Sequence, residues 1–150
     1  MTEQLRQTWD GHPVSPTPPF GAMIVVYRRR DLGHEFLMLH RRHLGAEYEG
    51  PWAWGPPSGA RYPGEEVDHC AARELHEETG IEAEACPVEG VAVDWPAYVL
   101  EAQPDVRLRL SPEHDRFRWL SYEDALARIE PPLVRDAFCA AVAALRLKGE

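Results

Sequence analysis

The stretch at residues 59–81, GARYPGEEVDHCAARELHEETGI, constrains this chain more than any other part of it. It predicts a helix over residues 65–79, because Pro63 and Gly64 precede that span and Gly80 follows it as a left-handed cap. Acidic residues crowd this helix, although like charges at helical spacing repel one another. The fold must therefore place the helix either in water or next to a positive charge.

Three of these acids share one face of the helix. At 100° per residue, Glu74, Glu77 and Glu78 fall within an arc of about 100°, and we expect Arg73 to point largely the other way. One explanation is a solvated acidic face. The other is a hard divalent cation among the carboxylates, with backbone carbonyls of the preceding loop as further oxygen ligands.

Composition narrows the class of protein. The 150 residues suffice for one domain with a hydrophobic core. Sixteen Lys and Arg residues stand against 25 Asp and Glu residues, for a formal net charge of −9. A general nucleic-acid binder normally has a basic surface, so we expect no nucleic-acid partner. Nucleotides are still allowed as ligands, because a metal ion can carry phosphate into an acidic site.

The cysteines and the apolar runs bear on the cellular compartment. Cys70, Cys86 and Cys139 are odd in number and lack metal-ligand spacing, so we interpret them as reduced thiols of a cytoplasmic protein. The first ten residues are polar and do not resemble a signal peptide. The longest apolar run, GAMIVVY, is too short to span a bilayer, and we expect no membrane partner.

The order of the expected elements indicates an α+β domain. Residues 1–19 are proline-rich, and we interpret them as an N-terminal tail or lead-in to one domain over residues 20–150. Apolar runs predict strands at residues 20–29, 35–42, 88–95, 97–103, 106–111 and 117–120. Further helices are predicted at residues 121–129, behind a serine cap, and 131–148. Strands, helix, strands and helices in this order favour a layered fold over regular βαβ alternation.

The acidic helix and its loop carry a family resemblance. Residues 59–81 match every specified position of the Nudix box: Gly59, five residues, Glu65, seven residues, then Arg73, Glu74, Leu75, any residue, Glu77, Glu78, any residue, Gly80 and Ile81. Trp54 and Pro57 are similar to the usual lead-in, and the resemblance extends from about residue 20 to the C-terminus. It implies a Nudix fold, which is an α/β/α sandwich around a mixed β-sheet.

One position departs from the family pattern. Ser58 stands where the first of two glycines is usual. If that position needs a positive φ, serine adds mild strain.

The resemblance also implies the site residues. A Mg2+ or Mn2+ cofactor would be held by the Gly59 backbone carbonyl and by the side chains of Glu74, Glu77 and Glu78. Glu74 serves either as a ligand or as the base, and Glu77 is a further candidate for a catalytic carboxylate. Glu65 and Arg73 are implied to form an ion pair that holds the box together.

A second candidate lies downstream, in SPEH at residues 111–114. The pattern resembles the C-terminal half of several Nudix subfamilies, in which a loop acid returns to the metal. Glu113 is therefore a candidate metal ligand or general base, and the alternative is an ordinary charged loop. We interpret His114 as a loop or packing residue.

Three residues are candidates for substrate binding. Arg41 and Arg42 follow the second predicted strand, where one of them grips a phosphate or both form a strand-end charge pair. Trp54, like Trp52 and Tyr62, either stacks on a base or anchors the proline-rich loop.

Together these features predict a Mg-dependent hydrolase that cleaves the pyrophosphate linkage of a nucleoside diphosphate joined to another moiety, by attack of water at phosphorus. Nucleoside triphosphates and dinucleoside polyphosphates are examples of such substrates. The alternative is a catalytically silent Nudix-like sensor of a nucleotide or metabolite. Such sensors usually lack one of the box acids, and none is missing here. The oligomeric state stays open, with a homodimer among the options.

Overall fold

The computed structural model describes residues 11–31, 33–89, 94–130 and 132–145. The strands within these ranges are β1 (Gly21–Arg30), β2 (Gly33–Arg41), β3 (Trp54–Gly55), β4 (Ser58–Ala60), β5 (Cys86–Pro87), β6 (Ala97–Glu101) and β7 (His114–Leu120). The helices are α1 (Val67–Thr79), α2 (Tyr122–Arg128) and α3 (Pro132–Leu145), with a single 3-10 turn, η1 (Arg42–Leu44).

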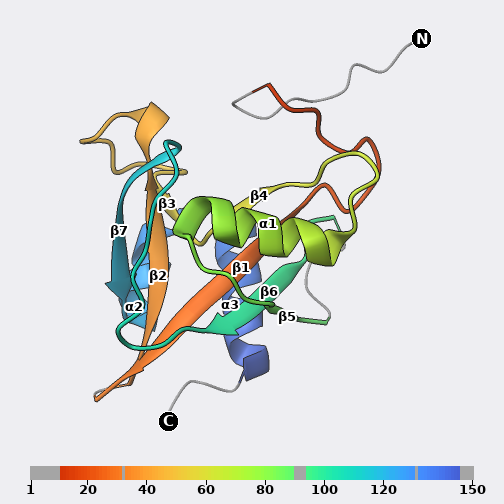
Figure 1. Cartoon of the computed structure of the whole chain (residues 1–150). Coiled ribbons are helices and arrows are strands. Elements are labelled where there is room, and N and C mark those ends of the chain that lie inside the picture. Colours follow the sequence, from red (N-terminus) through yellow and green to blue (C-terminus); the bar gives the residue numbers. More distant parts are fainter. Residues whose placement is uncertain (1–10, 32, 90–93, 131, 146–150) are drawn as a thin grey trace.

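The described strands form one mixed sheet. Its main path runs β3-β2-β1-β6-β5, with β4 paired to β1 and β7 paired to β2. The β1–β6 pair is parallel, and the remaining pairs are antiparallel. A parallel pair needs a crossover connection between its strands. Here the crossover contains α1, which fixes the acidic helix against one face of the sheet (Figure 1).

Helices cover both faces of this sheet, so the fold is an α/β/α sandwich. Alternate residues of β1 point to opposite faces: Met23, Val25 and Tyr27 pack with α2 and α3, and Ala22, Ile24 and Val26 pack with α1. Burial on both faces explains why the strand is an uninterrupted apolar run and not an alternating one. Figure 1 shows α1 in front of the sheet and α2 and α3 behind it.

Most predicted elements are present, with shifted ends. The acidic helix starts at Val67 and not at residue 65, because Glu65 still belongs to a turn in which its N–H donates to the Tyr62 carbonyl. Gly80 closes the helix in the left-handed conformation, with φ of 81°. Ser121 caps α2 as expected, since its Oγ accepts a hydrogen bond from the Asp124 N–H.

The strand predicted at residues 106–111 is wrong. Val106, Leu108 and Leu110 do pack against the α1 side of the core, and the residues between them are exposed. This alternation is what suggested a strand. None of the described strands pairs with the segment, which packs on the core through its side chains.

The strand predicted at residues 88–95 falls partly on residues 90–93, which lie outside the described residues. Residues 88–89 and 94–95 are not strand, and the short β5 strand lies just before them at Cys86–Pro87.

The lead-in segment, which we define as residues 11–19, lies against the domain. Val14 and Ser15 are buried, and the Ser15 N–H donates to the Arg61 carbonyl at 2.7 Å.

The described helices include none that is long and apolar enough to cross a membrane. The three cysteines are all free thiols, and burial raises the pKa of Cys70 to about 12.

Candidate active site

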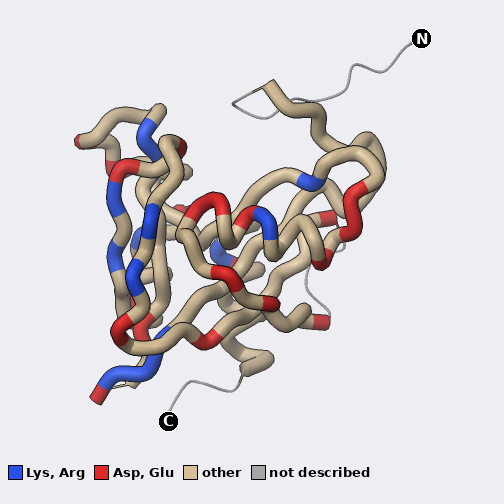
Figure 2. Tube along the Cα trace, in the orientation of Figure 1, with Lys and Arg blue, Asp and Glu red and all other residues tan. Residues whose placement is uncertain are grey.

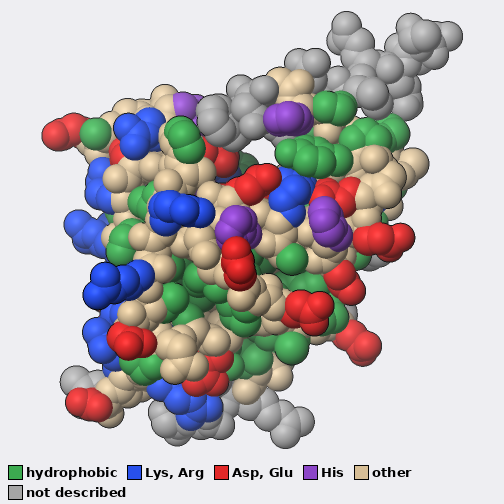
Figure 3. Space-filling view, viewed as in Figure 1, with side chains coloured by type: hydrophobic (Ala, Val, Ile, Leu, Met, Phe, Trp, Pro, Cys, Tyr) green, Lys and Arg blue, Asp and Glu red, His purple; other side chains and the backbone are tan. Residues whose placement is uncertain are grey.

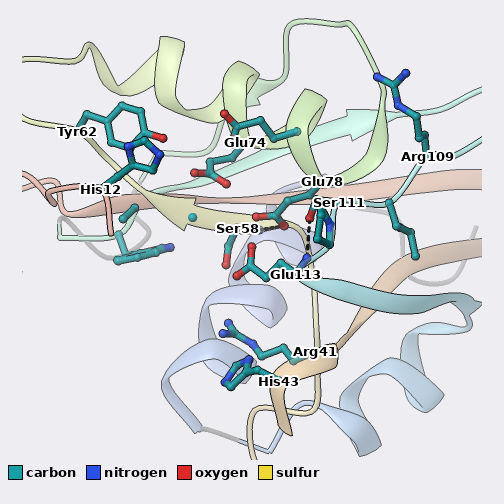
Figure 4. A pocket seen from close by; sticks show the side chains of 16 residues that line it. His12, Arg41, His43, Ser58, Tyr62, Glu74, Glu78, Arg109, Ser111 and Glu113 are labelled. Atoms are coloured by element: carbon teal, nitrogen blue, oxygen red, sulfur yellow. Dashed lines mark hydrogen bonds between the residues drawn. The ribbon is translucent and has the colours of Figure 1, made fainter. Parts of the chain in front are cut away.

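The carboxylates of α1 open onto a cavity of about 650 Å³. Strand β4, helix α1, the end of β2, the segment before β7 and the lead-in segment all contribute to its lining. Figure 4 shows Glu74, Glu78 and Glu113 in its middle, His12 and Tyr62 together at one end, and Arg41 and His43 on another side. Residues far apart in the sequence therefore meet around one group of acids.

Gly59 makes room for Glu74. A Cβ atom at Gly59 would collide with the carboxyl carbon and both carboxylate oxygens of Glu74. The glycine is thus required by close approach and not by its backbone angles, since its φ is not in the left-handed range. Burial raises the pKa of Glu74, against the lowering effects of Glu78 and Arg73.

Glu78 is the most buried acid of the cavity, with 1% of its surface exposed. Its Oε1 accepts a hydrogen bond from the Ser58 N–H at 3.2 Å, and its buried Oε2 has no hydrogen-bond partner. Burial, followed by the neighbouring Glu74 and Glu113 carboxylates, raises the pKa of Glu78 well above its ordinary value. The fold thus holds a carboxylate where its charge is poorly solvated and close to other acids.

Ser58 is not strained. Trp52 is the single non-glycine residue with a positive φ in the described ranges, so the concern about a left-handed serine does not apply. Ser58 is instead an ordinary strand residue, paired with Met23 of β1. Its contribution to the cavity is the backbone N–H that binds Glu78.

Arg73 does not point away from the acids, in contrast to the helical-wheel expectation. Its Nη1 lies 2.8 Å from Glu74 Oε1 and 3.3 Å from Glu77 Oε2. Because the arginine side chain is long and flexible, the direction of its Cβ does not decide where the guanidinium lies. Glu77 lines the cavity but is half exposed.

Glu65 and Arg73 are in direct contact. The guanidinium donates to both carboxylate oxygens of Glu65, at 2.7 and 2.9 Å, and also to the Ala60 carbonyl. Burial by itself raises the pKa of Glu65, but the bonds from Arg73, the Tyr62 N–H and His69 outweigh it and lower this pKa to about 2. The pair ties the loop before α1 to the second turn of the helix.

The loop before β7 brings Glu113 to the cavity. Arg42 binds this loop, with its Nε donating to the Pro112 carbonyl at 3.0 Å and its backbone N–H donating to the Glu113 carbonyl at 2.9 Å. His114 is buried beside Glu113, and burial and the charge of Arg41 lower its pKa to about 4. His114 is therefore a neutral packing residue.

The three candidates for substrate binding divide into separate roles. Arg41 lines the cavity, and its guanidinium lies 5.8 Å from the centroid of the Trp52 ring. Arg42 is engaged with the backbone of the loop before β7. Trp54 does not meet the expectation of a substrate contact, because it is 2% exposed, packs on His40 and donates its indole N–H to Glu49.

The sequence reasoning missed several residues that line the cavity: His12, His43, Trp95, Arg109 and Ser111. His12 lies in the segment that we interpreted as a tail, and Arg109 lies in the segment that we predicted as a strand. No local motif marks these positions. The proximity of Arg109 is set by its backbone N–H, which donates to the Thr79 carbonyl at the end of α1.

Charge is divided between the two sides of this region. Figure 2 shows acidic positions along α1 and basic positions along β7 and the segment before it. Figure 3 shows acidic and histidine side chains over the α1 face. The cavity lies where these regions meet, because Glu74 comes from α1 and Arg109 from the segment before β7. A ligand that is an anion with a bound cation would complement both sides of this boundary, since the cation would face the acidic side and the anion the basic side.

The donor chemistry fits a hard divalent cation. Within the described ranges, no three His, Cys, Asp or Glu side chains are already arranged as a metal site. Arg73 Nη1 instead contacts Glu77 and one oxygen of Glu74. The unpartnered buried oxygen of Glu78, adjacent to two further carboxylates, is the kind of group that a cation with oxygen ligands would satisfy.

Comparison with known proteins agrees with this geometry. The model of the NUDIX domain family matches residues 17–138. Bis(5'-nucleosyl)-tetraphosphatase (asymmetrical) of Rattus norvegicus is 38% identical over 112 residues, which are 64% of this chain and 71% of the relative. The enzyme of the same name from Sus scrofa is 32% identical over 123 residues, which are 68% of this chain and 78% of the relative.

A solved structure has the same fold. The binary complex of a Caenorhabditis elegans Ap4A hydrolase superposes with a TM-score of 0.66 at 24% identity, covering 84% of this chain and 96% of that chain. The chain therefore belongs to the Nudix family. The expected enzyme class, a Nudix pyrophosphohydrolase, and the expected α/β/α fold are both confirmed.

Proposed function

We propose that this chain hydrolyses a phosphoanhydride bond of a dinucleoside polyphosphate, with Mg2+ or Mn2+ as its cofactor. The single observation that carries the proposal is the convergence of Glu74, Glu78 and Glu113 on one cavity that also has basic residues around it. Carboxylates packed this closely are unfavourable on their own. They become favourable when a divalent cation and a polyphosphate occupy the site together.

The proposed roles follow from the positions of the residues. Glu74, Glu77, Glu78 and the Gly59 carbonyl would hold the cation, which supplies charge neutralisation at the phosphoryl oxygens when bound. Glu113, on the loop before β7, is the first candidate to accept the proton of the attacking water, and Glu74 is the second. Glu65 and Arg73 keep the loop and helix together and are positioning residues.

The choice of substrate class rests on two supports. Several similar proteins are named as asymmetrical tetraphosphatases of dinucleosides. Arg41 and His43 lie across the cavity from the end that holds His12 and Tyr62, so the cavity has room and positive charge on the side away from those rings. A chain of several phosphates requires such a second region of positive charge.

A substrate panel with Mg2+ tests this proposal. Diadenosine tetraphosphate, nucleoside triphosphates and nucleotide sugars are incubated with the protein, and products are separated by ion-exchange chromatography. We expect diadenosine tetraphosphate to give unequal products, and Glu78→Gln to lower kcat by at least about 100-fold. Glu82→Gln is the matched control, because Glu82 is an exposed acid outside the cavity.

Glu78→Gln should keep the fold, since it replaces a buried carboxylate by a neutral group of the same shape. Retained turnover in both Glu78→Gln and Glu77→Gln would contradict the proposal. Binding of nucleotide without Mg2+, together with no product from the whole panel, would favour the alternative of a silent sensor.

A further inference from the structure

The lead-in segment is fixed to the Nudix box by one arginine. Arg61 donates from Nε to the Pro19 carbonyl at 2.6 Å and from Nη2 to Ser15 Oγ at 2.9 Å and the Thr17 carbonyl at 3.1 Å. The same guanidinium donates from Nη1 to the Glu65 carbonyl. Figure 1 shows the lead-in segment running beside the loop between β4 and α1. The segment is therefore bonded to the loop that carries the catalytic box.

This attachment places His12 on Tyr62, the residue after Arg61. Their ring centroids are 5.4 Å apart with a tilt of 37°, and both residues line the cavity. Tyr62 also contacts the interior of the box, because the Arg73 guanidinium lies 3.8 Å from its ring centroid. His12 is exposed and lies at the same end of the cavity.

A third ring contributes to the lining. Trp95 is close to the start of β1, because a Cβ atom at Gly21 would collide with its indole. Gly21 pairs with Ala60, two residues before Tyr62, so these rings belong to one region of the cavity wall. In Figure 4, the His12 and Tyr62 rings lie apart from the Arg41 and His43 side chains. One end of the cavity is therefore aromatic and the other is cationic.

We infer that His12 and Tyr62 form the wall of a nucleobase subsite, so that the lead-in segment is part of the substrate site. The inference rests on the proposed function, because a nucleotide must enter the cavity. Flat aromatic surfaces bind nucleobases by stacking, which is tolerant of the identity of the base. The family model begins at residue 17, so His12 lies ahead of the part of the chain that it matches.

Steady-state kinetics of the His12→Ala variant test the inference. Stacking on one side chain contributes about 1–3 kcal/mol per base, so we expect KM for diadenosine tetraphosphate to rise about 10-fold at nearly unchanged kcat. Inorganic tripolyphosphate, which has no base, is used as a competitive inhibitor, and its inhibition constant should not change. His12→Phe restores a ring and should restore KM.

His76→Ala is the matched control, because His76 lies on α1 outside the cavity lining. An unchanged KM in His12→Ala would overturn the inference. An equal loss of affinity for tripolyphosphate would also overturn it, because it would indicate a contact with phosphate or a general structural effect.

The proposed function is judged separately, from turnover by the wild-type protein. If the wild type hydrolyses no dinucleoside polyphosphate, the same comparison is made by calorimetric binding of ATP and tripolyphosphate to the wild type and to His12→Ala. Weaker binding of ATP alone then supports the subsite, and equal binding of ATP by both proteins rejects it.

Discussion

At the scale of single residues, the site depends on side chains that are forced close together. Gly59 leaves the space that the Glu74 carboxylate occupies, and the Ser58 N–H orients one oxygen of Glu78. Arg73 balances this crowding by binding Glu65, Glu74 and Glu77. The identity of a box residue such as Gly59 is therefore explained by the space available around it as much as by its chemistry.

Gly59→Ala should strongly reduce activity. The added methyl group has to displace the Glu74 carboxylate or move β4 away from α1. We expect kcat to fall by at least about 100-fold, as for loss of a catalytic carboxylate. Gly55→Ala is the matched control, because a Cβ atom at Gly55 meets nothing within 4 Å and should leave activity close to that of the wild type. Equal activities in both variants would show that the close approach has no functional role.

Glu65 should make stability depend on pH. Its pKa is about 2 in the folded protein, below the ordinary value of 4.5, so its stabilising effect is complete above pH 4.5. This contribution is lost as pH falls from 4.5 toward 2. Glu65→Gln should cost about 2 kcal/mol in the free energy of unfolding at pH 7, and less at pH 3.5. Urea denaturation at both pH values measures this, and a cost independent of pH would contradict it.

At the scale of elements, the loop before β7 is held in place by the turn η1, which follows β2. Arg42 follows β2 directly and binds the Pro112 carbonyl, and its backbone binds the Glu113 carbonyl. From the sequence, one of Arg41 and Arg42 was expected to grip a phosphate, or both to form a strand-end charge pair. The fold shows that Arg42 binds this loop, which lies near it because β2 pairs with β7.

Arg42→Met should loosen the loop that carries Glu113. We expect kcat to drop about 10-fold while the free energy of unfolding changes by less than about 2 kcal/mol, since the side-chain hydrogen bonds from Arg42 to the Pro112 and His114 carbonyls are lost. Arg107→Met removes an exposed arginine from the segment before that loop and is the control. If both variants have the same kcat, the loop does not depend on Arg42.

The sequence was sufficient to predict those features of the helices that depend on residues close together in the chain. The cap at Ser121, the stop at Gly80 and the acidic face of α1 follow from chemistry within a few residues, and all three are present. The segment at residues 106–111 was mispredicted because alternation reports burial of one face, and packing on a helix produces the same alternation as pairing in a sheet. Strand pairing depends on distant partners that the local pattern does not contain.

At the scale of the whole molecule, two separate cores lie on the two faces of the sheet. One contains Cys70, Ala71 and Leu75 of α1, and the other contains Phe138, Ala141 and Val142 of α3. Among the described residues, α1 and α3 therefore belong to different cores, on opposite faces of the sheet. The family pattern was enough to predict this sandwich, but it carries no information about which residues outside the box reach the cavity.

Phe138→Ala should destabilise the protein without changing its chemistry. The ring is fully buried, packs edge-on against Phe36 and stacks with Tyr122. Its loss leaves a cavity and should cost about 3–5 kcal/mol, while kcat measured well below the melting temperature stays close to that of the wild type. Leu133→Ala, at an exposed position of the same helix, should cost less than about 0.5 kcal/mol. Calorimetric melting compares the two variants, and similar melting temperatures would contradict this assignment of the core.

The attachment of the lead-in segment by Arg61 has a practical consequence for recombinant work. The described part of the chain begins at Gly11, beside His12, which lines the cavity. A polyhistidine affinity tag placed directly ahead of Gly11 would bring imidazole groups near the carboxylates and compete for divalent cations. A tag after α3 starts on the opposite face of the sheet. Activities of the two tagged forms should therefore be compared before cation requirements are assigned.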